Sequence, residues 1–166
     1  MRPTLRAVFL ALTLGFGMQA MAGPLEEGAA AHNRGDYTTA LSLYRRAADQ
    51  GDETAQFILG VMYSKGQGAP QDYTTALSWY RRAAEQGNVG AQFILGVMYS
   101  KGQGGPQDYV LAHKWLNLAA SRFPASEKEQ RDAAVQVRDL IANKMTPAQI
   151  DEAQELARDW QPKPER

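Results

Sequence analysis

Two histidines and the lack of cysteine limit the chemistry open to this chain of 166 residues. His32 and His113 are the only imidazoles, so a His-rich metal site is excluded and a Ser-His-Asp arrangement would need one of the two. Without cysteine there is no disulfide framework, thiol nucleophile or Cys-ligated zinc. Because the two histidines are far apart in the sequence, we expect no catalytic residue, no metal site and no cofactor.

Paired arginines are the remaining charged feature that could bind a ligand. Arg45-Arg46 and Arg81-Arg82 recur in the same sequence context, so stacked units could align them as a basic stripe for an anion. The alternative is a solvated helix face that acidic neighbours neutralise. The chain has 18 basic and 18 acidic residues, and this balance favours the solvated face and argues against nucleic-acid binding.

The first 22 residues have the pattern of a secretory signal peptide. Arg2 and Arg6 precede the uncharged apolar run Ala7–Met18, and Ala20-Met21-Ala22 fits the cleavage pattern of small residues. We therefore expect cleavage before Gly23, an exported protein that is periplasmic or secreted, and no stable membrane insertion of the mature chain. An N-terminal membrane anchor is the alternative.

The rest of the chain is dominated by an internal repeat. Residues 36–70 and 72–106 are identical at 29 of 35 aligned positions, with an offset of 36, and a third partial copy begins at Asp108. A period of this length is typical of solenoids built from stacked helix pairs.

Each copy predicts two helices. The first kind follows Asp36, Asp72 and Asp108, whose carboxylates can each cap a helix N-terminus. The second kind, Ala55–Lys65 and Ala91–Lys101, is apolar almost all round. A helix of this kind is covered on more than one side or exposes an apolar face.

A glycine in the middle of each second helix predicts close packing. Gly60 and Gly96 each cost about 1 kcal/mol relative to alanine in a helix. We expect a neighbouring helix to approach so closely at these two positions that a Cβ atom would force the helices apart.

The repeat resembles the Sel-one-like repeat (SLR), a subfamily of the tetratricopeptide superfamily. The pattern AxxxLGxMYxxGxGxPxDYxxAxxWYRxAAxQG carries the resemblance, and most of it recurs from Ala91 to Ala120. The matching residues of the middle unit are Ala55, Leu59, Gly60, Tyr63, Gly66, Gly68, Asp72, Ala76, Trp79, Tyr80, Ala83, Ala84 and Gly87. The resemblance implies an all-α fold, a right-handed superhelical solenoid of antiparallel helix pairs, in which these residues build the fold and are not catalytic.

The two ends of the repeat predict helical caps. The expected organisation is a signal peptide (1–22), an N-terminal capping helix (23–34), a half repeat (35–52), two full repeats (53–88 and 89–124) and a C-terminal helical cap (125–166). Within the last segment, Ser126 with Glu129 indicates one capping box, and Thr146-Pro147 with Gln149 indicates a second helix start. We expect the last residues, Gln161–Arg166, to be frayed.

The second kind of helix supplies the candidate partner-binding residues. In stacked helix pairs these helices line the concave face, and the positions between the consensus residues are free to contact an extended peptide or a partner helix. The expected surface consists of two equivalent rows, Gln56, Phe57, Val61 and Ser64 with Gln92, Phe93, Val97 and Ser100. The alternative is that Phe57 and Phe93 pack between units as part of the core.

These observations favour a non-enzymatic module that binds a protein or peptide partner in the bacterial cell envelope, with its oligomeric state left open. The alternative is a hydrolase of cell-wall material or a β-lactam-binding protein, as the resemblance to Cys-rich secreted members of the family implies. This chain lacks their cysteines and has no SxxK motif.

Overall fold

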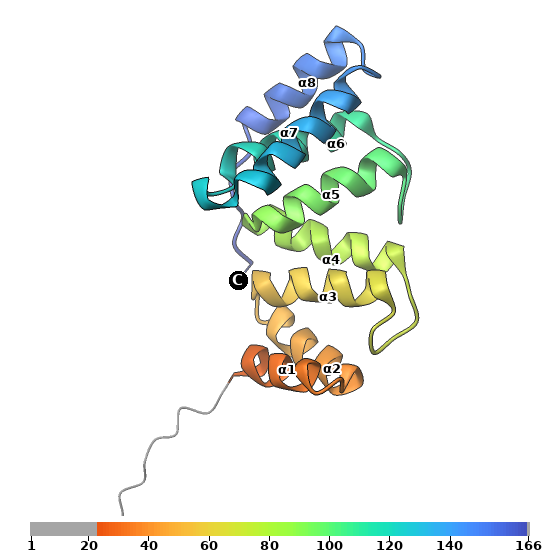
Figure 1. The fold of residues 1–166 in the computed structure, drawn as a ribbon, viewed down its shortest axis with the longest axis vertical. Coiled ribbons are helices and arrows are strands. Elements are labelled where there is room, and N and C mark those ends of the chain that lie inside the picture. The colour runs from red at the N-terminus through yellow and green to blue at the C-terminus, as the bar shows by residue number, and fades with distance from the viewer. Residues whose placement is uncertain (1–22, 166) are drawn as a thin grey trace, which may run out of the picture.

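A computed structural model describes residues 23–165 as a stack of α-helices (Figure 1). The expected signal peptide, residues 1–22, lies outside the described residues. The elements are α1 (Pro24–Asn33), α2 (Tyr37–Asp49), α3 (Glu53–Lys65), α4 (Tyr73–Gln86), α5 (Val89–Lys101), α6 (Tyr109–Arg122), the 3-10 turn η1 (Ala125–Glu127), α7 (Lys128–Ala142) and α8 (Pro147–Arg158). No strand occurs between residues 23 and 165. The predicted all-α solenoid of helix pairs is confirmed.

Helices α1 to α7 each pack mainly against their neighbours in the sequence, whereas α8 packs on α6. This arrangement of local contacts gives the elongated stack in which α1 and α8 lie at opposite ends (Figure 1). None of the helices between residues 23 and 165 combines the length and the apolar character that crossing a membrane requires.

Side chains cap the helices α2 to α6, and the three predicted caps are among them. The carboxylate or amide oxygens of Asp36, Asp52, Asp72, Asn88 and Asp108 accept backbone N–H groups of the following helix over 2.7 to 3.2 Å. Each cap satisfies backbone donors that have no partner inside the helix. The repeated spacing of these residues therefore determines where five helices begin.

The mid-helix glycines lie at the predicted close approaches. A Cβ atom built on Gly60 would lie 2.7 Å from Cδ1 of Tyr80, and one built on Gly96 would lie 2.6 Å from Cγ of Leu116. Both distances are well inside van der Waals contact, so only glycine allows α3 to reach α4 and α5 to reach α6 this closely.

The C-terminal cap agrees with the sequence in one capping box and differs in the other. Thr146 and Gln149 exchange both hydrogen bonds of a capping box at the start of α8. Ser126 and Glu129 do not, because Pro124 leads the chain into the turn Ala125–Glu127 and α7 then begins at Lys128 without a side-chain cap. Ser126 consequently lies inside a 3-10 turn rather than before a helix.

Candidate functional site

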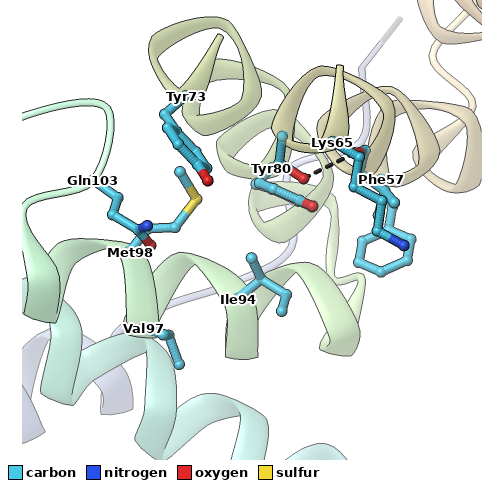
Figure 2. Close-up of a pocket in the computed structure, with 10 residues that line it drawn as sticks. Phe57, Lys65, Tyr73, Tyr80, Ile94, Val97, Met98 and Gln103 are labelled. Carbon is cyan, nitrogen blue, oxygen red and sulfur yellow. Dashed lines mark hydrogen bonds between the residues drawn. The ribbon is translucent and has the colours of Figure 1, made fainter. Parts of the chain in front are cut away.

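An open apolar groove separates α3 from α5 (Figure 2). Its volume is about 390 Å³, and Phe57 and Val61 of α3 face Ile94 and Val97 of α5 across it. Tyr80 of α4 lies between the two helices. Four of the predicted contact residues line this groove, namely Phe57, Val61, Ser64 and Val97.

Few polar groups are available to a ligand in the groove. Tyr80 is only 3% exposed, its ring lies 5.8 Å from that of Phe57, and burial raises the pKa of its phenol. The Ser64 hydroxyl donates to the carbonyl of Val61 over 2.8 Å, so it is satisfied within its own helix. Lys65 contributes the charge at one edge of the groove. The arrangement suits an apolar side chain from outside better than a charged ligand.

The second predicted row has different surroundings. Phe93 packs edge-on against Phe123, with ring centroids 6.4 Å apart, and belongs to the cluster that includes Ala134 and Val135 of α7. Ser100 lines a separate cavity with residues of α6 and α7. The two rows are therefore not equivalent surfaces: the cluster around Phe93 includes residues of α7, whereas Phe57 lines the open groove between α3 and α5.

The two glutamines predicted to be free are fully buried, which corrects that expectation. Gln56 and Gln92 have no exposed surface, and each donates from Nε2 to a carbonyl of the preceding helix, Ala48 at 3.3 Å and Ala84 at 3.2 Å. These carbonyls belong to the last turn of a helix, where backbone acceptors have no partner within the helix. Both glutamines therefore join the two helices of a pair.

The segment Gln161–Glu165, called the tail here, is bound to the solenoid, so the expectation that it frays is wrong. It runs back from α8 and ends beside the start of α3 (Figure 1). Trp160, just before it, packs against Trp115 at 6.2 Å, and the Arg122 guanidinium lies 4.9 Å from its ring centre. Further along, the Lys163 N–H donates to the carbonyl of Glu85 over 2.8 Å.

The Glu165 side chain has the most extensive contacts of the tail. Its carboxylate accepts from Arg82 through both Nε (2.9 Å) and Nη2 (2.5 Å), and from Nε2 of Gln56 (2.9 Å). Its backbone N–H donates to Oε1 of Gln86 over 3.2 Å. We call Gln56, Arg82, Gln86 and the Glu85 carbonyl the tail seat.

Electrostatics within the tail seat agree with this geometry. The hydrogen bonds from Arg82 are the main cause that holds the pKa of Glu165 below its ordinary value, and the same contact raises the pKa of Arg82. The guanidinium also lies 4.5 Å from the ring centre of Trp79. A bidentate guanidinium held over an aromatic ring is an arrangement suited to recognising a carboxylate.

Sequence reasoning identified the repeated arginines as a possible anion site but missed the partner in the tail. One signal was present in the aligned repeats: Arg82 and Gln86 correspond to Leu118 and Arg122 in the next unit. The partial third copy therefore lacks an arginine at the position of Arg82 and an amide at the position of Gln86. Glu165 has no comparable sequence signal.

The two histidines lie on different helices. His32 is on α1, where its ring packs edge-on against Tyr37 at 5.0 Å, and His113 is buried on α6. In the part of the chain that the structure describes, no group of three His, Asp or Glu side chains is placed to hold a metal ion.

The family model described as Sel1 repeat matches residues 18–52, 54–88 and 89–122. The first match includes α1, which the sequence analysis expects as a cap. No protein with curated annotation matches the chain.

Two solved structures share the fold. The first is c5321, a protective antigen present in uropathogenic Escherichia coli strains and displaying an SLR fold, with 30% identity, a TM-score of 0.72 and coverage of 82% of this chain and 29% of that one. The second is a Sel1 repeat protein from Oxalobacter formigenes, with 35% identity, a TM-score of 0.56 and coverage of 61% and 40%. This chain thus spans less than half the length of either structure. The matched repeats cover more than half of the present chain, which belongs to the Sel1 repeat family.

Proposed function

We propose that this protein is a non-enzymatic interaction module of the bacterial cell envelope that binds an apolar segment of a partner protein between α3 and α5. Sel1 repeats are helical modules that generally mediate protein–protein interaction, and their fold is typically a non-catalytic scaffold. The envelope location is supported by the signal-peptide pattern of residues 1–22.

The observation that carries the proposal is the open groove. Phe57, Val61, Ile94 and Val97 line one side or the other of a space of about 390 Å³, and all four remain partly exposed. An aromatic side chain in an apolar pocket near the centre of an interface is a common anchor for a partner. The buried Tyr80 gives this surface a fixed floor, so little conformational entropy is lost when a partner binds.

The test first identifies the partner and then changes the groove. A partner recovered from the periplasmic fraction by affinity purification and mass spectrometry is titrated calorimetrically against the purified protein and its Phe57→Ser variant. We expect at least a tenfold loss of affinity, since a central aromatic contact contributes about 1–2 kcal/mol or more. Far-UV circular dichroism should show unchanged helicity.

Leu140 provides the matched control, because it is a large apolar side chain that is 65% exposed on α7. Leu140→Ser removes apolar surface away from the groove and should leave the affinity unchanged. Equal affinity of the wild-type protein and the folded Phe57→Ser variant would show that the partner does not bind between α3 and α5.

A further inference from the structure

The tail seat is a preformed site. Apart from Glu165, its side chains already have partners in the solenoid: Gln56 and Arg82 both donate to the Ala48 carbonyl over 3.3 Å, and Gln86 donates to the Gly51 carbonyl over 3.0 Å. The amide of Gln86 also donates to Oε1 of Gln56 over 2.9 Å. These contacts do not involve the tail, so they can hold the donors in place for a carboxylate when the tail is absent.

The tail that occupies the seat is held by few and exposed contacts. Residues 161–165 are all exposed, and the side chains of the Arg82–Glu165 ion pair retain 36% and 31% of their accessible surface. An ion pair as exposed as this one contributes little to stability. Besides the ion pair, the tail is held by the hydrogen bond from Gln56 to the Glu165 carboxylate and by the two backbone N–H groups of Lys163 and Glu165. A segment bound in this way can be displaced.

The contacts of the tail also indicate which kind of peptide segment the tail seat can bind. Pro162 and Pro164 have no N–H, and the N–H groups of the residues that follow them, Lys163 and Glu165, both donate to the seat. Pro162 lies near Gly87, where a Cβ atom would be 3.8 Å from the proline ring. The seat therefore fits an extended segment with an acidic side chain two residues after its first backbone donor.

The next unit of the solenoid repeats only half of this arrangement. Gln92 donates to the Ala84 carbonyl as Gln56 does to Ala48, but its Oε1 is buried without a hydrogen-bond partner. Leu118 stands where Arg82 would, so this unit offers no guanidinium there. The groups that bind the carboxylate are therefore found together at one junction between repeats, and the repeat pattern alone does not produce them.

We propose that the tail seat binds an acidic, proline-containing extended segment of a partner protein, and that the chain's own tail occupies the seat until such a segment displaces it. This inference rests on the proposed function, and it adds a second, polar recognition point where the last turns of α4 meet the start of α3. The tail acts as a tethered competitor, whose effective concentration is on the order of millimolar for a short linker.

The test uses the full chain and a capped synthetic peptide of sequence QPKPE, followed by the NMR shifts of the Gln56 and Gln86 side-chain amides. Glu165→Lys removes the tail's carboxylate and leaves the seat unchanged, so this variant should bind the peptide about three- to fivefold more tightly than the wild-type chain. A peptide with Gln in place of Glu should bind about three- to fivefold more weakly than QPKPE.

Two arginine variants in the Glu165→Lys background show whether the seat is responsible. Arg82→Gln should lose about three- to fivefold in peptide affinity, and Arg82→Lys, which keeps the charge but not the paired donors, should lose less. Arg46→Gln changes the equivalent arginine of the preceding unit and should have no effect.

The proposal is overturned if Glu165→Lys binds the peptide no better than the wild-type chain, or if the Gln peptide binds as well as QPKPE. It is also overturned if the folded arginine variants at position 82 retain full affinity. Failure of these titrations, with Phe57→Ser still weakening partner binding, would reject the tail seat alone. Peptide binding that depends on Arg82, with no effect of Phe57→Ser, would support the seat and reject the groove.

Discussion

Single side chains in this protein gain their roles from the groups packed around them. Gln56 and Gln92 occupy identical sequence contexts, yet Gln56 also reaches Glu165, whereas Oε1 of Gln92 has no partner. His113 is a second buried group of this kind, because it is 4% exposed and its Nδ1 has no hydrogen-bond partner. Whether a buried polar atom has a hydrogen-bond partner therefore depends on groups outside its own repeat.

His113 makes a prediction about pH. Burial, assisted by the charge of Arg138 and opposed by Asp139, lowers its pKa, and Arg158 lines the same cavity. Below about pH 6.5 the unfolded chain therefore binds a proton that the folded chain resists, so the free energy of unfolding should fall as the pH drops from 7 towards 5. Chemical denaturation at both pH values measures this.

The His113→Gln variant should lose much of that pH dependence, and His32→Gln serves as the control for the other histidine. If His113→Gln and the wild-type protein lose stability equally between pH 7 and pH 5, His113 is not the group responsible.

At the scale of the elements, the helices are determined by local signals and their spacing by glycine. The capping residues start the helices, and the positive φ angles of Gly66 (68°) and Gly102 (66°) end α3 and α5. Gly60 then allows α4 to approach α3 closely, and Gly96 allows α6 to approach α5. These are contacts between neighbours in the sequence, which explains why the repeat pattern could predict them.

Gly96 supplies the prediction for this scale. Gly96→Ala would bring a Cβ atom to 2.6 Å from Cγ of Leu116 and 3.1 Å from the Ala112 carbonyl. Such overpacking costs about 1–3 kcal/mol, which exceeds the gain of up to about 1 kcal/mol from helix propensity. We expect a net loss of about 1–2 kcal/mol in the free energy of unfolding by urea denaturation.

Gly90→Ala is the control within the same helix. Its Cβ atom would lie 3.4 Å from the Phe57 ring, and Thr54 occupies the equivalent position in α3. This variant should be as stable as the wild-type protein or more stable by about 0.5 kcal/mol. A stable Gly96→Ala variant would mean that α5 and α6 can separate at no cost.

At the scale of the whole molecule, position along the stack distinguishes repeats that are nearly identical in sequence. Beyond α5 and α6 the repeat gives way to the C-terminal cap, whose α7 contributes to the cluster of buried residues around Phe93. Phe57 therefore lines a groove, while Phe93 joins two clusters of buried residues, one of which includes Ala134 of α7.

The same substitution should consequently have different costs in the two repeats. We expect Phe93→Ser to lower the free energy of unfolding by about 3 kcal/mol and Phe57→Ser by about 1 kcal/mol, because truncation costs more where neighbouring atoms enclose the ring. Urea denaturation of both variants measures the difference. Equal losses would show that the two rings are equally enclosed, and would remove Phe57 as an anchor for a partner.

The sequence by itself determined the repeat, its helix pairs, their caps and the close approaches at glycine. All of these depend on residues within one repeat period, and they follow from hydrogen bonding and steric size at known spacing. Of the two predicted rows, Phe57, Val61, Ser64 and Val97 line the groove and the remaining four residues do not, and binding of a partner by these residues stays a prediction.

Only the tertiary structure decided which row stays open and where the tail lies. Glu165 contacts Arg82, which is 83 residues earlier in the sequence, and Gln56, which is 109 residues earlier. Both separations far exceed the period of the repeat. Whether such distant groups meet depends on the curvature of the whole stack. This curvature arises because small rotations between neighbouring units add up along the solenoid. Local patterns specify each unit of this protein, and the accumulated geometry of the units specifies its surfaces.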